Sequence, residues 1–252
     1  MRIVVIGGTG LVGAKVVHAL SERGHDVLAA SPRTGVDTVT GVGLSDALRG
    51  AAVVVDGSNS PSFDDAEAME FFRTATANLL GAEADAGVGH HVALSVVGTD
   101  RLAPASGYFE AKLTQESLIS SGPVPYTIVR ATQFFEFLRS IADSATVDDT
   151  VSLPPALIQP MASADVAEGV ALAAVAAPVN GIIEIGGPEP FRLDEVIRTA
   201  LAARGDARRV VSDPTAHYWG IAIGERTLIP AEGAALFDTR LADWILETAA
   251  RL

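Results

Sequence analysis

Cysteine is absent from the 252 residues, which excludes a disulfide, a thiol nucleophile and a cysteine-ligated iron–sulfur cluster. Basic residues are scarce: 18 lysines and arginines stand against 31 aspartates and glutamates, for a formal net charge of −13. Such a surface disfavours nucleic acid and anionic membranes as partners. No apolar run is long enough to span a bilayer, and no signal peptide is recognisable. We therefore expect a cytoplasmic protein without nucleic-acid or membrane partners.

What is present is an alternation of strand and helix patterns over the first part of the chain. Short β-branched runs, typical of strands, alternate with runs of helical periodicity, which predicts an α/β fold with a Rossmann-like, doubly wound parallel sheet. The expected strands are 2–6, 26–30, 37–39 (weak), 52–56, 91–97 and 126–130, and the expected helices are the one after residue 13, 44–48, 64–86, 108–120 and 133–144.

The first strand and helix are joined by a turn that contains four glycines. Both Gly8-x-Gly10-x-x-Gly13 and Gly7-x-x-Gly10-x-x-Gly13 fit this turn. The start of a helix presents unpaired N–H groups and a positive dipole end, which bind phosphate where no side chain blocks the approach. The pattern is the dinucleotide-binding fingerprint, although glycines alone are weak evidence for it. The predicted contacts to the dinucleotide are Gly7, Thr9, Gly10, Leu11, Val12 and Gly13.

The end of the second strand favours NADP over NAD. An NAD site typically has an acidic residue there, whereas this chain has Ser31 and Arg33 and no carboxylate. A guanidinium pairs well with a 2′-phosphate, and a serine hydroxyl adds a hydrogen bond. An ordinary solvent-exposed arginine is the alternative. After the strand 52–56, Gly57, Ser58 and Asn59 are expected near the nicotinamide ribose, unless they only form a turn.

Tyr108 and Lys112 are the candidate catalytic pair. Lysine occurs only at positions 15 and 112, whereas arginine occurs 16 times, so an ammonium at 112 is a distinctive choice. The Tyr-x-x-x-Lys spacing puts both side chains on one helix face, where the ammonium would lower the pKa of the phenol. Tyrosine would then pass a proton to a carbonyl oxygen that receives a hydride. An aromatic anchor on an amphipathic helix is the alternative.

Ser95 ends the strand 91–97 and is expected to donate a hydrogen bond to the substrate oxygen, unless it only caps the backbone. Gln133 and Phe134 follow the strand 126–130 and are expected to bind substrate, although an apolar core position is as reasonable for Phe134. No metal site is expected, because the adjacent His90 and His91 lack an accompanying carboxylate cluster.

With these motifs the chain resembles the short-chain dehydrogenase/reductase superfamily, and within it the atypical, NmrA-like NAD(P)-binding branch. The segments that carry the resemblance are 7–13, 94–98, 108–112, 129–134 and 164–167, and a closing stretch that ends at Asp243-Trp244. The resemblance implies a Rossmann core with a small C-terminal substrate region, and the same roles for Ser95, Tyr108 and Lys112. Many members of this branch lack the tyrosine, and some bind NADP to sense redox state instead of catalysing a reaction.

We therefore expect residues 1–150 to form the NAD(P)-binding Rossmann core. Residues 151–252 are expected to complete the fold and cover the substrate pocket, with helices at 165–176, 193–203 and 241–252 and a strand at 181–185. The expected function is NADPH-dependent reduction of a carbonyl or conjugated carbonyl of a small, largely apolar substrate, by a monomer or homodimer. The alternatives are a non-catalytic NADP sensor and an NAD(P)-dependent epimerase or dehydratase.

Overall fold

A computed structural model describes residues 1–249, and the chain divides into two compact units. The first unit comprises residues 1–130 and 166–183, and the second comprises residues 131–165 and those from 184 onward. Each unit is thus built from two separate segments, whereas the sequence analysis placed a single boundary at 150. Among the described helices, none combines the length and the apolar content that crossing a membrane requires.

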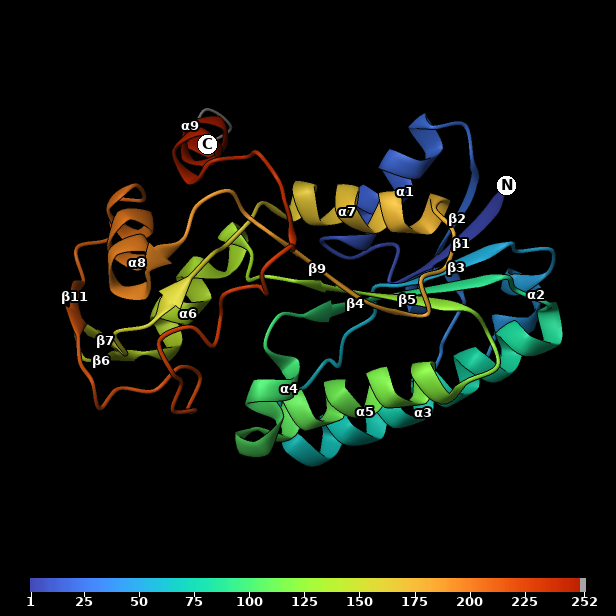
Figure 1. The fold of residues 1–252 in the computed structure, drawn as a ribbon, viewed down its shortest axis with the longest axis horizontal. Helices are drawn as coiled ribbons and strands as arrows, with labels where there is room; N and C mark the ends of the chain where they lie inside the picture. Colours follow the sequence, from blue (N-terminus) through green and yellow to red (C-terminus); the bar gives the residue numbers. More distant parts are fainter. Residues whose placement is uncertain (250–252) are drawn as a thin grey trace. The chain divides into compact units, whose positions relative to one another are not determined.

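The first unit contains most of the central sheet and the helices that flank it (Figure 1). Its elements are β1 (Arg2–Ile6), α1 (Gly13–Glu22), β2 (Asp26–Ala30), α2 (Leu44–Leu48), β3 (Val53–Asp56), α3 (Asp65–Ala86), β4 (His90–Val96), α4 (Thr99–Leu102), α5 (Gly107–Ser121), β5 (Tyr126–Ala131), most of α7 (Ser163–Val175) and the start of β9 (Gly181–Gly186).

The central sheet has seven strands in the order β12-β9-β5-β4-β3-β1-β2, which confirms the predicted α/β, Rossmann-like fold. The pairs β1–β2, β1–β3 and β3–β4 are parallel. In Figure 1, α3 and α5 cover one face of the sheet in the first unit, and α1 and α7 cover the other. Because the sheet is covered on both faces, its strands are rich in buried apolar residues, and Val4, Val54 and Val92 are fully buried.

The strand order reverses between β1 and β3, because β2 is added on one side of β1 and β3 on the other. In open α/β sheets a ligand binds beyond the carboxyl ends of the strands at this reversal. A ligand is therefore expected beside the residues that follow Ile6 and Asp56.

The weak strand predicted at 37–39 is wrong. Oδ1 of Asp37 accepts hydrogen bonds from the N–H groups of Val39 at 2.8 Å and Thr40 at 3.2 Å. A side chain that binds nearby N–H groups in this way favours a turn over strand pairing. The predicted helix 133–144 begins later, with a 3₁₀ turn at Phe135–Phe137 followed by α6 (Leu138–Ser144).

The second unit contains small sheets. Strands β6 (Thr146–Val147), β7 (Thr150–Leu153) and β11 (Arg209–Ser212) form one sheet, and β8 (Leu157–Ile158) pairs with β10 (Phe191–Arg192). The remaining elements are α8 (Leu193–Ala202), β12 (Ala235–Leu236) and α9 (Leu241–Ala249). Strands β7 and β11 were not predicted from the sequence, because they pair with residues distant in the chain or with a two-residue strand. The last three residues of the predicted helix 241–252 lie outside the described part.

Candidate functional site

Three of the glycines between β1 and α1 are required by close backbone packing. A Cβ on Gly13 would lie 2.2 Å from the carbonyl oxygen of Gly7, so α1 begins directly against the turn. Gly7 has a φ of +72°, and a Cβ there would lie 2.8 Å from the carbonyl oxygen of Gly57. A Cβ on Gly8 would lie 2.7 Å from the carbonyl oxygen of Val5. These three positions fix the shape of the turn and its contact with the loop after β3.

Gly10 differs from the other three glycines. A Cβ on Gly10 would meet only the carbonyl oxygen of Gly7, at 3.2 Å, and its φ is not in the left-handed region. Gly10 is exposed, so a Cβ there would be crowded on the side of Gly7 and open on its outer side. The N-cap position of α1, Val12, makes no side-chain hydrogen bond to the helix N-terminus. An uncapped helix start beside an open glycine fits a phosphate-bearing ligand.

Ser31 and Arg33 lie at the same edge of the sheet as this turn. The N–H of Gly8 donates to the carbonyl oxygen of Ala30 at 3.2 Å, which joins the turn to the end of β2. Ser31 is buried, and its hydroxyl has no hydrogen-bond partner among the described residues. Arg33 is exposed on a 3₁₀ turn, Pro32–Thr34. The structure thus brings together the glycine turn, a buried hydroxyl and an exposed guanidinium.

The loop Gly57–Asn59 lies against the glycine turn as well. The N–H of Gly57 donates to the carbonyl oxygen of Ile6 at 3.0 Å. Asp56, buried at the end of β3, accepts hydrogen bonds from Ser58 through its N–H at 3.0 Å and its hydroxyl at 2.6 Å. Asn59 accepts a hydrogen bond at Oδ1 from the hydroxyl of Tyr108 at 3.0 Å. The predicted cofactor loop and the predicted catalytic tyrosine are therefore in direct contact.

Tyr108 stands in an aromatic cluster at the start of α5. Its ring centroid lies 5.2 Å from that of Phe63, 6.0 Å from Phe72 and 5.4 Å from Phe109. Burial raises the pKa of Tyr108 to about 12, although the hydrogen bond to Asn59 acts in the opposite direction. The expectation that Lys112 lowers the pKa of this phenol is wrong. At neutral pH the hydroxyl keeps its proton.

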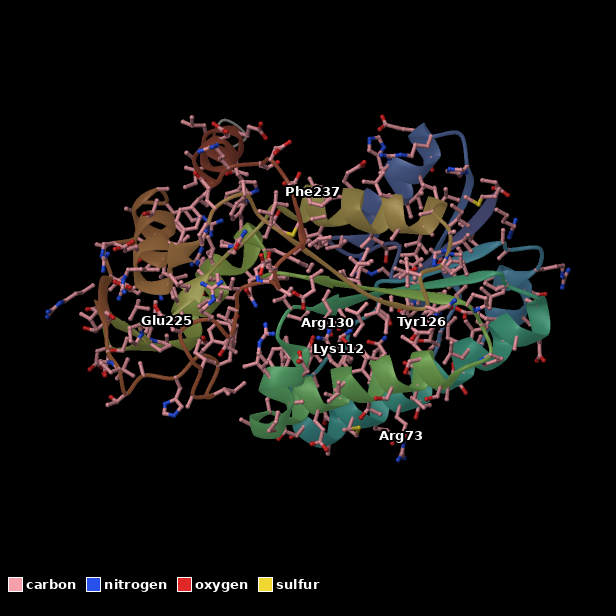
Figure 2. All side chains as sticks on the ribbon, in the orientation of Figure 1. Arg73, Lys112, Tyr126, Arg130, Glu225 and Phe237 are labelled. Carbon is pink, nitrogen blue, oxygen red and sulfur yellow. The ribbon has the colours of Figure 1, made fainter. Side chains whose placement is uncertain are left out.

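Lys112 projects from α5 toward the sheet and is buried (Figure 2). Its Nζ donates to the carbonyl oxygen of Leu94 at 3.0 Å and to Oε1 of Gln115 at 2.5 Å, and lies 4.8 Å from the ring centroid of Phe72. Burial lowers the pKa of Lys112 to about 8, against the charges of Asp56 and Glu116, which raise it. The ammonium is thus occupied by contacts with the protein.

Ser95 is buried, and its hydroxyl donates to Oε1 of Glu116 at 2.5 Å. Glu116 in turn accepts from Nε of Arg130 at 3.0 Å and from Nη2 at 2.6 Å. Nη1 of Arg130 donates to Oδ1 of Asp100 at 2.8 Å. Arg130 is labelled in Figure 2, on β5. The hydroxyl proton that was predicted to reach the substrate is directed at Glu116 instead.

Four of these residues were missed as site residues by the sequence analysis: Asp56, Gln115, Glu116 and Arg130. Two of them could have been recognised from the sequence. A charged residue inside a buried strand, such as Arg130, has to be paired, and Asp56 is a carboxylate at the carboxyl end of a fully apolar strand. Gln115 and Glu116 are polar residues of a helix, and helical periodicity alone does not show that they are buried.

Gln133 and Phe134 belong to the second unit and are described within it. Both polar atoms of the Gln133 side chain are buried without a hydrogen-bond partner among the described residues, as is the hydroxyl of the neighbouring Thr132. Phe134 stacks on Phe137 at 5.3 Å between ring centroids. Because buried polar groups are seldom left unpaired, the amide of Gln133 is suited to a ligand that both donates and accepts. Among the described residues no group of three or more metal-binding side chains is found.

Solved structures with the same fold include several that hold a nicotinamide dinucleotide. UDP-glucose 4-epimerase of Thermus thermophilus, in complex with NAD, is 20% identical over 91% of this chain and 92% of its own, with a TM-score of 0.69. A short-chain dehydrogenase/reductase superfamily protein of Agrobacterium tumefaciens with bound NAD is 19% identical over 100% of this chain and 96% of its own, with a TM-score of 0.70. The dTDP-4-dehydrorhamnose reductase of Bacillus anthracis, in complex with NADP, is 13% identical over 96% of this chain and 92% of its own, with a TM-score of 0.67.

At these identities the likeness shows a shared fold over nearly the whole chain. No family model matches the sequence, and the search of curated proteins gives no match either.

The buried ammonium of Lys112 predicts an unusual dependence of stability on pH. Between its folded pKa of about 8 and its ordinary value of 10.5, the unfolded chain holds a proton that the folded chain has released. The free energy of unfolding therefore rises with pH, for this group by about 2 kcal/mol between about pH 7.5 and 9.5. We expect the wild type to show this gain relative to Lys112→Met in urea unfolding at the two pH values.

Lys15→Met is the control for this measurement, because it removes the only other lysine. It is expected to keep the wild-type dependence on pH. Parallel curves for the wild type and Lys112→Met would show that Lys112 titrates as an ordinary, solvated lysine.

Proposed function

We propose that the protein is an NADP-dependent oxidoreductase of the short-chain dehydrogenase/reductase type, from its NmrA-like branch. It would reduce a carbonyl or conjugated carbonyl of a small, largely apolar substrate. The observation that carries the proposal is the glycine turn. Backbone atoms leave no room for a Cβ on Gly7, Gly8 or Gly13, whereas the outer side of Gly10 is open. Beside Gly10 lie the uncapped N-terminus of α1 and the loop that contacts Tyr108.

The residues present fit a dinucleotide. Gly10 and the start of α1 would hold the pyrophosphate, and the loop Gly57–Asn59 would border the nicotinamide ribose. Among the other predicted contacts, Leu11 is exposed, and Thr9 lies within the turn. When bound, NADPH supplies a hydride to the substrate carbon. The chain's own residues then have to supply a proton and orient the substrate oxygen.

Tyr108 is the proposed proton donor. Its raised pKa keeps the proton on the hydroxyl at neutral pH, and its present acceptor, Asn59, is a neutral amide that a substrate oxygen can replace. Lys112 is proposed to anchor the nicotinamide ribose. Ser95 is proposed to contact the substrate oxygen. To donate to it, the hydroxyl has to turn away from Glu116, which keeps Arg130 as its partner.

The preference for NADP rests on the loop after β2. Ser31 has a buried, unpartnered hydroxyl within the described chain, and Arg33 is exposed. The next carboxylate along the chain, Asp37, has one oxygen engaged by two backbone N–H groups of its own loop. No acidic residue at the end of β2 would therefore repel a 2′-phosphate.

Gln133 and Phe134 are the proposed substrate contacts from the second unit, on the grounds of the unpaired amide and the stacked rings. The proposal includes a cytoplasmic location, a small-molecule substrate, no nucleic-acid or membrane partner, and a monomer or homodimer.

An epimerase or dehydratase that uses NAD(P) is a second candidate, because the structures of like fold include a UDP-glucose epimerase and the hexosamine dehydratase TunA. A redox sensor that binds NADP without turnover is a third candidate. It is favoured because the hydroxyls of Tyr108 and Ser95 already donate their hydrogen bonds to Asn59 and Glu116. Turnover of a ketone, enone or quinone with consumption of NADPH separates the first candidate from the other two.

Gly10→Ala tests the dinucleotide site. A methyl group at the open face would keep the phosphate from the backbone, so we expect NADPH affinity to fall about tenfold or more while the fold is kept. Gly81→Ala on α3 is the matched control, because a Cβ there would meet nothing within 4 Å. Binding is measured by the fluorescence of NADPH. Equal affinities in the two variants would show that phosphate lies elsewhere.

Arg33→Ala tests the preference for NADP. Loss of a charge-assisted pair with the 2′-phosphate should weaken NADPH binding by about tenfold to a hundredfold. NADH lacks that phosphate and serves as the control ligand, with an unchanged dissociation constant. If both ligands bind the variant as they bind the wild type, Arg33 lies outside the site.

Tyr108→Phe tests the proton donor, because it keeps the ring and removes only the hydroxyl. Turnover of a substrate found in an NADPH-consumption screen of ketones, enones and quinones should fall by about two to four orders of magnitude. Dinucleotide affinity should stay close to that of the wild type. Tyr126→Phe, at the start of β5, is the control and should keep full activity. Near wild-type activity in Tyr108→Phe would exclude this mechanism and leave the fold assignment intact.

A further inference from the structure

The ammonium of Lys112 is held by a defined set of neighbours. It has three N–H donors, and two of them are directed at oxygen atoms, the carbonyl of Leu94 and Oε1 of Gln115. The face of the Phe72 ring, 4.8 Å away, provides a cation–π contact. Of these neighbours, Gln115 is the one whose side chain continues to a further charged group.

Gln115 joins Lys112 to Asp56. Its Oε1 accepts from Nζ of Lys112 at 2.5 Å, and its Nε2 donates to Oδ2 of Asp56 at 2.9 Å. The reverse orientation of the amide would set donor against donor and acceptor against acceptor, so the neighbours determine which way the amide points. A neutral amide is the one side chain of this length that satisfies a cation at one end and an anion at the other. Glutamate would repel Asp56, and leucine would leave both groups unpaired.

Asp56 carries the connection to the loop Gly57–Asn59. Its second oxygen, Oδ1, accepts the N–H and the hydroxyl of Ser58. The next residue in this loop, Asn59, holds the hydroxyl of Tyr108. An unbroken series of hydrogen bonds therefore runs from the loop, through Asp56 and Gln115, to Lys112.

We propose that Gln115 and Asp56 are positioning residues for Lys112, which hold its ammonium against β4 and tie it to the loop Gly57–Asn59. The inference rests on the proposed function only in giving Lys112 a task at the dinucleotide. The contacts themselves are independent of it. Lys112 is buried, so without Gln115 and Asp56 only the Leu94 carbonyl, the Phe72 ring and the charge of Glu116 would offset the loss of water around its ammonium.

The electrostatic contributions agree with this geometry. The charged groups that act on Lys112 are Asp56, from β3, and Glu116, from α5, and both raise its pKa against the effect of burial. Glu116 is already paired with Arg130, whereas Asp56 reaches Lys112 through Gln115. Removing the charge of Asp56 should therefore make the Lys112 ammonium a stronger acid.

The experiment uses the full chain labelled with ¹³C at lysine Cε. With only two lysines, NMR spectra contain two signals, and Lys15 serves as the internal reference. The Lys112 signal is followed against pH without dinucleotide. We expect Asp56→Asn to lower its apparent pKa by about one unit and Gln115→Glu to raise it. Glu110→Gln, which removes an exposed carboxylate from the same helix, is the control and should leave it unchanged.

A purely structural role for Asp56 and Gln115 would change stability and leave the Lys112 titration where it is, which would overturn the proposal. The same conclusion follows if Glu110→Gln shifts the titration as much as Asp56→Asn does. If Asp56→Asn does not fold, the proposal is tested by Gln115→Glu alone. The proposal is contradicted if the apparent pKa of Lys112 does not rise in that variant. Failure to bind NADPH in a separate titration would overturn the proposed function and not this assignment.

Discussion

The helix α5 buries a lysine, a glutamine and a glutamate against an apolar sheet, and each of these side chains has to be paired there. An unpaired charge in such a place costs several kcal/mol, and an unpaired amide costs less but still more than one kcal/mol. The partners come from three strands: Asp56 on β3, the Leu94 carbonyl and Ser95 on β4, and Arg130 on β5. This pairing requires one position of α5 over the sheet, and Tyr108 is placed by the same helix.

The pairing also determines the state of the protons at the candidate site. The hydroxyl of Tyr108 is bonded to Asn59, and the hydroxyl of Ser95 is bonded to Glu116. A substrate oxygen would therefore exchange one hydrogen bond for another, and the net gain in free energy from each exchange is small. These two hydroxyls would therefore contribute little to the affinity for a substrate.

Much of the fold could be predicted from local patterns. Strands β1 and β2 are short runs of mostly apolar residues, and a glycine or a serine follows each of them, so both were predicted with the bounds they have. The strand predicted at 37–39 failed because the side chain of Asp37 competes for the backbone. The strands β7 and β11 were missed because their pairing joins residues about sixty positions apart, Thr150 with Arg209.

In the candidate site, the backbone shape of the glycine turn could be predicted from the sequence. The hydrogen-bond partners of the side chains were harder to predict. The spacing of Tyr108 and Lys112 suggested a contact between them. In the structure Tyr108 donates its hydrogen bond to Asn59 and Lys112 donates to Gln115, because the side-chain oxygens of Asn59 and Gln115 lie within hydrogen-bonding distance. Spacing along a helix states which residues share a face, and it does not state which of several acceptors a donor will select.

The chain passes between its two units at residues 130–131, 165–166 and 183–184. The segment that returns to the first unit supplies α7, whose residues Ala167, Val170 and Ala171 are fully buried. A fragment that ends near residue 150 would keep α1 and lack α7, so it would expose to water the part of the sheet that α7 covers (Figure 1), and would be prone to aggregate. The segments of the two units alternate along the chain, so neither unit can be excised as one continuous piece and simple gene fusion cannot exchange them.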